Sequence, residues 1–398
     1  MKTLILLTHT LSDAVNSGFL PAAKRLGLQV VLLTDHPDVH RNYFQDGDLT
    51  DHPSEIISCD VFNPLAVIET ISRLAEIPAA IFSNSDHLQT STAVAAQYFG
   101  LPGKNWMVAY LCKNKAQMRL RQSLLGMDSL TYQTVNDVTQ LSAWKMPFPC
   151  VVKPKEGVAS QHVRLAVNFA ALQRQCNAIW EARPGCTLLV EEYLEGPLYT
   201  LETLGDGTQF SVLGGFRVTL SPPPNFVELY AQWEHEPPMA HEVVRQIKAM
   251  GVGFGACHTE YVVTPNGPRL IEINYRCIGD HREFLLEQAL KIPFFEIILR
   301  LHLGEPLNPL QVSTNAAEIR YLTAASSGTV TAIPAAFTRA EQQTTVSFRQ
   351  LRQVGDQIVI SHSNKDYIGV VSGFGRDRLA LKQAIEHVAA GLRWEIQV

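Results

Sequence analysis

The stretch of sequence that decides the fold runs from His258 to Asp280 and reads HTEYVVTPNGPRLIEINYRCIGD. Its centre, Pro265–Pro268, is strong turn chemistry between two runs that suit strands, so we predict a β-hairpin. Side chains alternate between the two faces of a strand, so residues two apart share a face. The charged and amide side chains that matter on this hairpin are Glu260, Glu272, Asn274 and Arg276. The last three share one parity and are expected to leave the same face.

The position of Glu260 relative to Glu272 depends on the turn. An even loop centred on Asn266 and Gly267 would set Glu260 opposite Ile273, and Glu272 would point away. A three-residue loop, or one β-bulge, sets Glu260 opposite Glu272 on the same face. We predict this second register.

Two carboxylates, a carboxamide and a guanidinium on one face are unfavourable unless something charged lies there. A divalent cation with a polyphosphate fits, because Mg²⁺ takes oxygen ligands and typically uses one or two carboxylates plus substrate phosphates. The competing interpretation is a solvent-facing hairpin in which Arg276 forms a salt bridge with a glutamate. Ordinary antiparallel strands often carry polar outer faces of that kind.

The composition of the chain excludes several classes of function. The 398 residues suffice for two or three domains, and 46% hydrophobic with 18% charged residues is ordinary globular composition. A net charge of −5 without a dense run of Lys or Arg argues against a nucleic-acid partner. The longest apolar runs, such as Leu4–Leu7 and Val30–Leu33, fall far short of the roughly 20 residues of a membrane span. No membrane partner is therefore expected.

The N-terminus and the cysteines indicate a cytoplasmic protein. The opening MKTLILLTHT has an apolar part too brief for a signal peptide and fits a buried first strand. The seven cysteines show no CxxC spacing, which is typical of reduced core residues in a cytosolic protein.

The first hundred residues alternate strands and helices, which predicts a parallel sheet with helices on both faces. The expected strands are 3–8, 29–34 and 79–82, and the expected helices are 12–26, 64–77 and 88–99, with a polar stretch over 35–63. Ligands bind beyond the carboxyl ends of such strands, so Thr8–Thr10 and Ser83–Asp86 are candidate substrate-side loops. His9 is either part of that site or a loop histidine without a role. No GxGxxG follows the first strand, so dinucleotide binding is not expected.

The rest of the chain mixes strands and helices before it turns β-rich. The expected strands are 149–153, 188–193 and 210–220, and the expected helices are 113–125, 166–182, 241–250 and 282–303. From about Ala316 onward the pattern is β-rich, with a closing helix over 379–392. We expect a small separate domain there.

Lys153 ends an apolar strand, where an unpaired charge is strongly disfavoured and a phosphate would satisfy it. The following loop, Lys155–Val163, is rich in small residues, and such loops can fold over phosphates and offer backbone N–H groups. The loop is not a Walker A sequence. The alternative is a plain hairpin loop beside a snorkelling lysine.

Val190–Gly196 (VEEYLEG) ends a strand and enters a turn. Such a segment can present backbone N–H and C=O groups to an adenine ring while a nearby carboxylate binds ribose hydroxyls. The alternative is an acidic strand end exposed to water. Lys115, on its predicted helix, could reach a polyphosphate as a point charge, although a lone surface lysine is more often only solvated.

In this order and spacing, the segments resemble the ATP-grasp superfamily of carboxylate–amine ligases over most of the chain. Within that superfamily, the chain is most similar to the L-amino acid ligases, or dipeptide synthetases. The resemblance implies an α/β fold, α+β overall, in three parts. These are an N-terminal parallel-sheet pre-ATP-grasp domain (residues 1–108), a two-lobed ATP-grasp domain (109–308) and a small β-rich C-terminal domain (309–398).

The resemblance also implies roles for individual residues. Arg276 looks like the catalytic arginine. The implied magnesium ligands are Glu260, Glu272 and Asn274. The implied ATP-binding residues are Lys115, Lys153, Gly157, Ser160, Glu191, Glu192, Tyr193 and Leu194. The implied substrate-side residues are Ser85, Asp86, Glu228 and Gly279.

The chain departs from the family pattern at two places. Relatives commonly carry an acidic residue for the ribose two positions after the linker glycine, where this chain has Leu198, and Glu195 or Glu202 is expected to compensate. After the catalytic arginine relatives often have a small residue and two glycines, whereas this chain has Cys277–Gly279 (CIG). That segment is expected to lie toward the acceptor pocket, which implies an unusual substrate.

The implied reaction is ATP-dependent ligation with Mg²⁺ or Mn²⁺. A carboxylate takes the γ-phosphate of ATP, which gives an acyl phosphate and ADP, and an amine then displaces phosphate to form an amide. The implied partners are a small-molecule carboxylate and an amine, by default amino acids, with a secondary-metabolite or siderophore pathway left open. Relatives are often dimers, so a homodimer is also implied. The alternatives are a carboxylase-type ATP-grasp enzyme and a nucleotide-binding regulatory protein without turnover.

Overall fold

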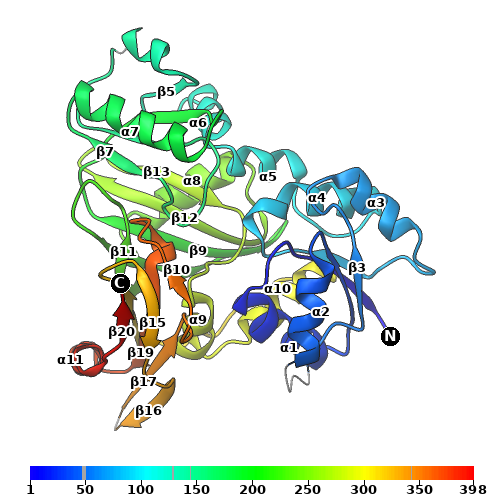
Figure 1. Cartoon of the computed structure of the whole chain (residues 1–398). Helices are drawn as coiled ribbons and strands as arrows, with labels where there is room; N and C mark the ends of the chain where they lie inside the picture. Colours follow the sequence, from blue (N-terminus) through cyan, green and yellow to red (C-terminus); the bar gives the residue numbers. More distant parts are fainter. Residues whose placement is uncertain (47–50, 128–129, 144, 342) are drawn as a thin grey trace.

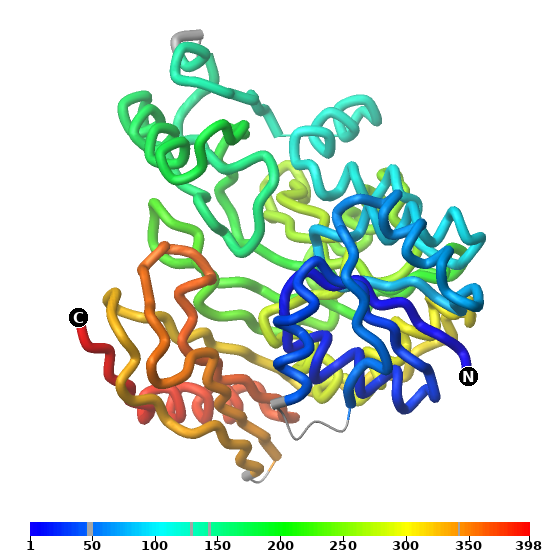
Figure 2. Tube along the Cα trace, turned by 45° about the vertical axis from the view of Figure 1, so that its right-hand side comes forward, coloured from blue at the N-terminus to red at the C-terminus, as the bar shows by residue number. Residues whose placement is uncertain are grey.

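The computed structural model describes residues 1–46, 51–127, 130–143, 145–341 and 343–398. An N-terminal α/β unit, a large central sheet, a lobe above that sheet and a β-rich C-terminal region make up the molecule (Figure 1). The same regions remain distinct in a second view, with the two chain ends on opposite sides (Figure 2). Among the helices of the described ranges, none has the length and apolarity that spanning a bilayer requires.

The N-terminal sheet is parallel, as predicted, and its strands have the order β3-β2-β1-β4. Its strands are β1 (Thr3–Leu7), β2 (Gln29–Thr34), β3 (Glu55–Ser58) and β4 (Ala80–Phe82). Its helices are η1 (Ala14–Phe19), α1 (Leu20–Arg25), α2 (Pro37–Asp46), α3 (Pro64–Ser72), η2 (Asp86–Leu88) and α4 (Gln89–Tyr98). Leu4 and Leu6 pack in one hydrophobic cluster and Ile5 and Leu7 in another, so both faces of the sheet are covered.

The central sheet has the order β13-β12-β9-β10-β11-β14-β19-β17-β16. Its strands from the middle of the chain are β9 (Leu198–Asp206), β10 (Phe210–Leu220), β11 (Glu228–Glu234), β12 (Phe254–Thr264) and β13 (Gly267–Asn274). Its strands from the C-terminal region are β14 (Ala316–Thr323), β16 (Phe337–Glu341), β17 (Thr344–Gln350) and β19 (Tyr367–Gly375). Tyr230 of β11 pairs with Arg320 of β14, so the C-terminal strands continue the same sheet.

A second antiparallel sheet, in the order β5-β8-β6-β7, lies above the central sheet (Figure 1). It contains β5 (Tyr132–Val135), β6 (Cys150–Pro154), β7 (Arg164–Ala166) and β8 (Leu188–Glu192), with helices η3 (Val138–Ala143) and α7 (Phe169–Ala182). We call this unit the lid lobe. Helices α5 (Trp106–Lys113) and α6 (Lys115–Leu124) lead from the N-terminal unit into it.

The C-terminal region adds a small sheet in the order β18-β15-β20. Its strands are β15 (Gly328–Ala332), β18 (Gln357–Ile358) and β20 (Glu395–Gln397). Helix α11 (Arg378–Gly391) packs on β14, β17 and β19, and η4 (Asn364–Asp366) precedes β19. Helix α8 (Ala240–Ala249) packs on β13.

The β12–β13 hairpin has the predicted register. Thr264 pairs with Gly267 across the turn, and a bulge after Glu260 shifts the ladder so that Glu260 faces Glu272. The bulge inserts one extra residue into β13 and re-aims the side chains beyond it. The prediction that one bulge would bring the two glutamates to one face is confirmed.

The helix predicted over 282–303 is wrong in its extent, because the segment forms two helices. These are α9 (Arg282–Leu290) and α10 (Phe294–His302). Lys291 has a left-handed φ of 55° and Pro293 follows it, and both features end a helix. Helix α10 then packs against β4 on one side and against β9 and β12 on the other, which joins the N-terminal unit to the central sheet.

Several elements escaped prediction. The polar stretch over 35–63 contains α2 and β3, and β9 and β11 were not predicted as strands. On β9 the polar residues Thr200, Glu202 and Thr203 are buried, so the polar positions of this strand do not mark a solvent-exposed face. The alternation of apolar and polar residues that identifies a half-buried strand is therefore absent from β9, and the strand could not be predicted from it.

Candidate active site

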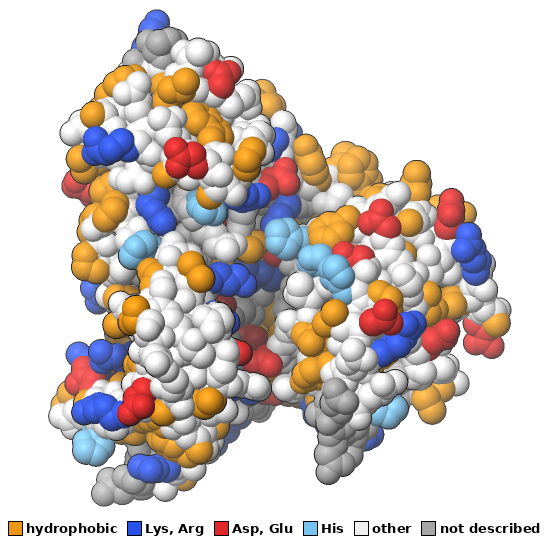
Figure 3. Space-filling model, in the orientation of Figure 1, with side chains coloured by type: hydrophobic (Ala, Val, Ile, Leu, Met, Phe, Trp, Pro, Cys, Tyr) orange, Lys and Arg blue, Asp and Glu red, His pale blue; other side chains and the backbone are white. Residues whose placement is uncertain are grey.

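A cavity of about 830 Å³ lies where the lid lobe, the central sheet, the N-terminal unit and the C-terminal region meet. The space-filling view shows the hollow between these parts, with acidic and basic side chains on its walls (Figure 3). All the residues predicted to be catalytic, magnesium-binding, ATP-binding or substrate-side by the ATP-grasp resemblance line this cavity. They are Ser85, Asp86, Lys115, Lys153, Gly157, Ser160, Glu191, Glu192, Tyr193, Leu194, Glu228, Glu260, Glu272, Asn274, Arg276 and Gly279.

Glu260, Glu272 and Asn274 lie together on the β12–β13 hairpin. Glu260 and Glu272 are opposite one another, and Asn274 Nδ2 donates a hydrogen bond to Glu260 Oε1 at 3.4 Å. The three side chains bring carboxylate and amide oxygens to one wall of the cavity. This donor set suits a hard divalent cation.

His258 contacts this wall from β12, two residues before Glu260 and opposite Asn274. Its Nδ1 lies 2.8 Å from Glu202 Oε1, and its Nε2 lies 3.4 Å from Glu260 Oε1. Burial would lower the pKa of His258, but the two glutamates outweigh burial and raise it to about 9. Burial likewise would raise the pKa of Glu260, and hydrogen bonding and charge from His258 lower it instead. His258 was not predicted as a site residue, although its spacing of two residues from Glu260 places both on one strand face.

Lys115 stands at the first turn of α6 and reaches the hairpin. Its Nζ lies 2.7 Å from Glu272 Oε1 and donates to the carbonyl oxygen of Gly157 at 3.3 Å. Burial would lower the pKa of Lys115, but the charge of Glu272 raises it, so the ammonium group stays charged. One cation therefore links α6, the hairpin and the small-residue loop.

Lys153 and Glu191 form a buried ion pair together with Arg119. Lys153 Nζ lies 2.5 Å from Glu191 Oε2, and Arg119 Nε lies 2.6 Å from Glu191 Oε1. Arg119 also donates to the carbonyl oxygens of Leu270 and Ile271, at 2.9 and 2.8 Å. Burial would raise the pKa of Glu191, but the two cations lower it to about 2.

This arrangement restricts how Glu191 can contact a ligand. Its carboxylate is engaged with the two cations, so only its backbone is offered to a ligand. Arg119 was not predicted as a site residue. It lies one helical turn after Lys115 on α6, a spacing that places both side chains on one face of the helix.

The predicted substitutes for a ribose-binding acid are not in the cavity. Among the described residues that line it, neither Glu195 nor Glu202 is found. Glu195 is exposed, and Glu202 is buried beside His258. Glu192 does line the cavity, and Arg269 Nη2 lies 2.8 Å from its Oε1.

The small-residue loop between β6 and β7 folds over the cavity and contacts the C-terminal region. Ala159, Ser160 and His162 have positive φ values of 56°, 53° and 59°. The backbone N–H of Asn364 donates to the carbonyl oxygen of Ala159 at 3.1 Å. Arg164 donates to the carbonyl oxygens of residues 361 and 362, at 3.1 and 3.4 Å. The loop is thus held in one conformation from outside the lid lobe.

Arg276 faces the N-terminal unit across the cavity. Burial would lower its pKa, but Asp86 and further acidic groups raise it, so the guanidinium stays charged. Asp86 forms an ion pair with Lys113. Burial would raise the pKa of Asp86, and the charges of Lys113 and Arg276 lower it.

A second acidic group lies deeper, around the start of α9. Glu228 Oε2 lies 2.7 Å from Arg282 Nη1, and burial is the main cause that raises the pKa of Glu228. Glu283 is buried, its Oε2 has no hydrogen-bond partner among the described residues, and burial raises its pKa to about 8. A carboxyl in this state is protonated at neutral pH and can donate a hydrogen bond.

The C-terminal region supplies part of the cavity wall, which the sequence did not predict. Arg352, Asn364, Lys365 and Tyr367 all line the cavity. Asn364 accepts a hydrogen bond from the backbone N–H of Glu228 at 3.1 Å, and Tyr367 donates to the carbonyl oxygen of Glu228 at 2.7 Å. No local pattern could place these residues near β11, more than 100 residues earlier in the chain.

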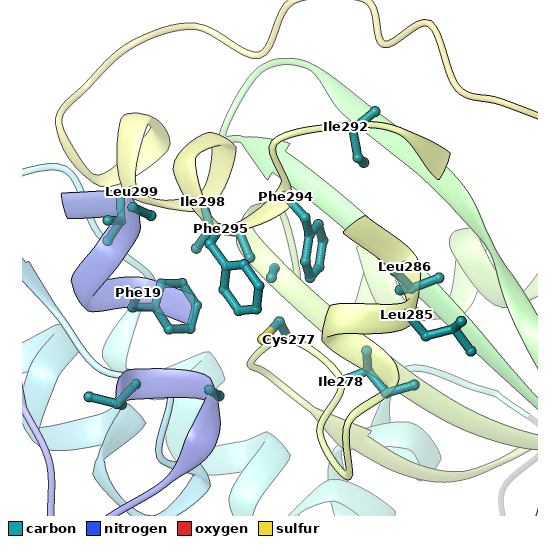
Figure 4. Close-up of a cluster of buried hydrophobic side chains, with 14 of the residues drawn as sticks. Phe19, Cys277, Ile278, Leu285, Leu286, Ile292, Phe294, Phe295, Ile298 and Leu299 are labelled. Carbon is teal, nitrogen blue, oxygen red and sulfur yellow. The ribbon is translucent and has the colours of Figure 1, made fainter. Parts of the chain in front are cut away.

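The expectation that Cys277 and Ile278 face the acceptor pocket is wrong. Neither belongs to the described cavity lining, and both are buried in the hydrophobic cluster shown in Figure 4, beside Phe295 and α9. Cys277 Sγ donates to Asn84 Oδ1 at 3.0 Å. Packing between the N-terminal unit and the central sheet therefore explains the departure from the family pattern, and only Gly279 of this segment reaches the cavity.

Solved structures similar to this chain decide its fold. An L-amino acid ligase from Bacillus licheniformis has a TM-score of 0.81 at 18% identity, covering 100% of this chain and 99% of that one. The chain has the ATP-grasp fold. A phosphoribosylglycinamide synthetase from Anaerococcus prevotii gives 0.71 at 18% identity, with full coverage of both chains. The biotin carboxylase domain of Hydrogenobacter thermophilus 2-oxoglutarate carboxylase, a complex with MgADP and bicarbonate, gives 0.70 at 17% identity over 99% and 91% of the chains.

Curated sequences agree with the ATP-grasp resemblance, while no protein-family model matches the chain. An uncharacterized Sinorhizobium fredii protein, y4rH, is 25% identical over 99% of this chain and 83% of its own length. Carnosine synthase 1 of Gallus gallus is 25% identical over 65% of this chain, and dapdiamide A synthase of Enterobacter agglomerans is 22% identical over 45%. These matches span 30% and 45% of the two synthases.

Proposed function

We propose that the protein is an ATP-dependent carbon–nitrogen ligase that activates a carboxylate as an acyl phosphate and joins it to an amine. One observation carries the proposal: two buried lysines, two glutamates, an asparagine and an arginine converge on one cavity from four segments of the chain. Two of these charges already pair with each other, Lys115 with Glu272, and Lys153 pairs with Glu191. MgATP would supply charges of both signs in one ligand.

The residues present fit MgATP. Glu260, Glu272 and Asn274 would hold Mg²⁺ or Mn²⁺ through oxygen atoms, and the ion when bound neutralises phosphate charge. Lys115 forms an ion pair with Glu272, and Lys153 forms one with Glu191. When ATP is bound, phosphate oxygens would replace these glutamates as the partners of the two ammonium groups. Backbone groups of Glu191–Leu194, with Gly157 and Ser160 of the loop, would hold the nucleotide. The MgADP complex of a structural neighbour supports this assignment.

The chain's own groups account for the chemistry that follows. Phosphoryl transfer needs positioning and charge neutralisation more than covalent help. Arg276, with its rigid fork of donors, would hold the acyl phosphate and then the oxyanion that forms when the amine attacks. The Lys155–Val163 loop covers the cavity and would exclude water, which would otherwise hydrolyse the acyl phosphate.

We propose amino acids as the default substrates. The names of the similar proteins, an L-amino acid ligase, carnosine synthase and dapdiamide A synthase, support this class of acid and amine. Ser85, Asp86, Glu228 and Gly279 would face the substrate. Three further expectations stay predictions: the domain limits at residues 108 and 308, a homodimer, and a cytoplasmic location. The free thiols of the described cysteines are compatible with a cytoplasmic location.

The test is ADP release, coupled to an optical readout, across a matrix of amino acids and other acids with amines. Acid-dependent ADP formation with amide product in mass spectrometry is the expected result. Bicarbonate is one arm of the matrix, and ADP release with bicarbonate alone would favour a carboxylase. ATP binding without ADP formation for any acid–amine pair would favour a regulatory nucleotide-binding protein.

A further inference from the structure

A second group of potential ligands lies at the carboxyl edge of the N-terminal sheet, away from the oxygen-lined hairpin. His9 follows β1, and Asp35 and His36 follow the adjacent strand β2, just before α2. Histidine side chains gather on the N-terminal unit where it faces the hollow (Figure 3). Parallel strands end at the same edge of their sheet, which brings the two short loops together.

The three side chains already lie close to one another. His9 Nδ1 is 2.8 Å from Asp35 Oδ2, and His36 Nε2 is 3.7 Å from the same oxygen. One donor atom from each residue lies within 4.8 Å of the others. In a tetrahedral site with bonds of about 2.0–2.1 Å, ligand atoms are roughly 3.3 Å apart. Small side-chain rotations would therefore close these three atoms around an ion.

His40 provides a second and independent observation. It lies one helical turn after His36, and its backbone N–H donates to the carbonyl oxygen of His36 at 3.4 Å. Its side chain is fully buried, and neither ring nitrogen has a hydrogen-bond partner among the described residues. A buried imidazole without a partner is costly, and such groups call for an explanation such as an ion. Burial is the main cause that lowers the pKa of His40, and the charges of Asp35, His36 and His9 also act on it. Its ring nitrogens are not among the donor atoms that lie within 4.8 Å of one another, so His40 would have to move toward the other three to share an ion with them.

We propose that His9, Asp35 and His36 form a binding site for one divalent transition-metal ion of the Zn²⁺ type, and that His40 joins them through a side-chain movement. Imidazole nitrogens suit Zn²⁺ and related first-row ions, and histidines four apart at a helix start are a common ligand spacing. The donor set differs from the carboxylate and amide oxygens of the hairpin, which suit Mg²⁺. The two sites therefore select different ions.

The proposed metal site lies at the edge of the cavity, so a bound ion would affect the cavity wall. His9 also lines the catalytic cavity, as do Thr8 and Thr10. An ion held between the two loops would fix the Thr8–Thr10 loop at the edge where substrates are proposed to bind. This inference does not rest on the ligase proposal, because the site and its test involve no ATP.

The experiment is a titration of the full chain, stripped with EDTA, with Co²⁺ as a spectroscopic substitute for Zn²⁺. Excess Mg²⁺ is present so that oxygen-lined sites are filled. One Co²⁺ per chain with the visible absorption bands of a four- or five-coordinate ion is the expected result. Zn²⁺ should displace the signal, and the Glu272→Gln variant should retain it.

Ligand variants make the test specific. Asp35→Asn and His36→Ala should each lower Co²⁺ affinity at least ten-fold, and His40→Leu should do the same. His387→Ala, an exposed histidine on α11, is the matched control and should bind Co²⁺ as the native chain does. Circular dichroism checks that each variant is folded. No stoichiometric Co²⁺ signal in the native chain, or an unchanged signal in the Asp35 and His36 variants, overturns the proposal, and an unchanged signal in His40→Leu removes His40 from the site.

Discussion

Lys153 and Glu191 form an ion pair of 2.5 Å at the junction of β6 and β8, and both side chains are buried. Glu191 belongs to the segment proposed to hold adenine, and Lys153 is proposed to bind phosphate. The pair therefore connects the adenine end of the proposed ATP site to its phosphate end. Arg119 on the other carboxylate oxygen ties the same pair to the hairpin strand β13.

The first prediction concerns this pair. Glu191→Gln leaves two buried cations without their counter-charge and is expected to cost roughly 3–5 kcal/mol of unfolding free energy. The folded-state pKa of about 2 lies below the ordinary 4.5, so the carboxylate stabilises the fold above pH 4.5. That stabilisation is lost as pH falls toward 2. Denaturant titrations at pH 7, 4 and 3 should show the native chain losing its advantage over the variant as the pH drops.

Glu195→Gln is the matched control for this prediction, because Glu195 is exposed in the same segment. It should change the unfolding free energy by no more than about 0.5 kcal/mol. A Glu191→Gln variant as stable as this control at pH 7 would show that the buried pair does not hold the lobe together.

The second prediction uses the buried carboxyl of Glu283. Its pKa of about 8 exceeds the ordinary 4.5, so folding favours its protonated form. That form stabilises the fold fully below pH 4.5, and the benefit is lost as pH rises through 8. Glu283→Gln, which stays neutral, should therefore be more stable than the native chain at pH 8.5 and about equal at pH 5. Thermal unfolding should show a gain of a few degrees at the higher pH, equivalent to about 1 kcal/mol or more.

A melting temperature that Glu283→Gln leaves unchanged at pH 8.5 would mean that the carboxyl ionises without penalty. Gln keeps the size of the side chain, so lost packing is a poor explanation for either result.

The third prediction tests the proposed metal ligands on the β12–β13 hairpin. Glu272→Gln removes a proposed magnesium ligand and the partner of Lys115 while it keeps the side-chain volume. Substrate-dependent ADP release is expected to fall at least ~100-fold, since even outer-shell changes at metal sites cost 10–100-fold. The same coupled assay at saturating ATP measures it, and raising Mg²⁺ should recover part of the rate.

Glu242→Gln is the control, because Glu242 is a half-exposed residue of α8 that pairs with Arg245 on its own helix. Full activity of folded Glu272→Gln would contradict the metal assignment without bearing on the ATP-grasp fold.

The fourth prediction concerns the loop over the cavity. Arg164→Ala removes the two hydrogen bonds to the carbonyl oxygens of residues 361 and 362. Loss of about 1 kcal/mol would raise the open population of the loop roughly five-fold. The ratio of phosphate released to amide formed should then increase, because water reaches the acyl phosphate. Arg174→Ala, on the exposed face of α7, should leave that ratio unchanged.

The hairpin shows what sequence alone can predict. Turn residues and strict alternation are local, so Glu260, Glu272, Asn274 and Arg276 could be assigned to one face, and the bulge could be anticipated because only one register brought the glutamates together. The parallel N-terminal sheet was predictable for the same reason, since its strands are short continuous apolar runs.

The remaining features depend on contacts between distant segments. Arg119 is an ordinary helical arginine until the fold places Glu191 beside it, and His258 is an ordinary strand residue until β9 brings Glu202 next to it. The buried polar residues of β9 and the cavity wall from Arg352 to Tyr367 fall in the same class. Cys277 and Ile278 were misread because packing, and not substrate, fixes their identity.

The pairing of β11 with β14 has a mechanical consequence. It makes the C-terminal strands part of the same hydrogen-bonded sheet that carries Glu260, Glu272 and Asn274, the proposed metal ligands, so these parts cannot separate without breaking a ladder. The lid lobe has its own sheet and is held from the C-terminal side by a few bonds, among them Asn364 to Ala159 and Arg164 to residues 361 and 362. Opening of the lid lobe on this side would break these hydrogen bonds and leave the ladder of the large sheet intact. Mechanical or denaturant stress should detach the lid lobe before it disturbs the large sheet.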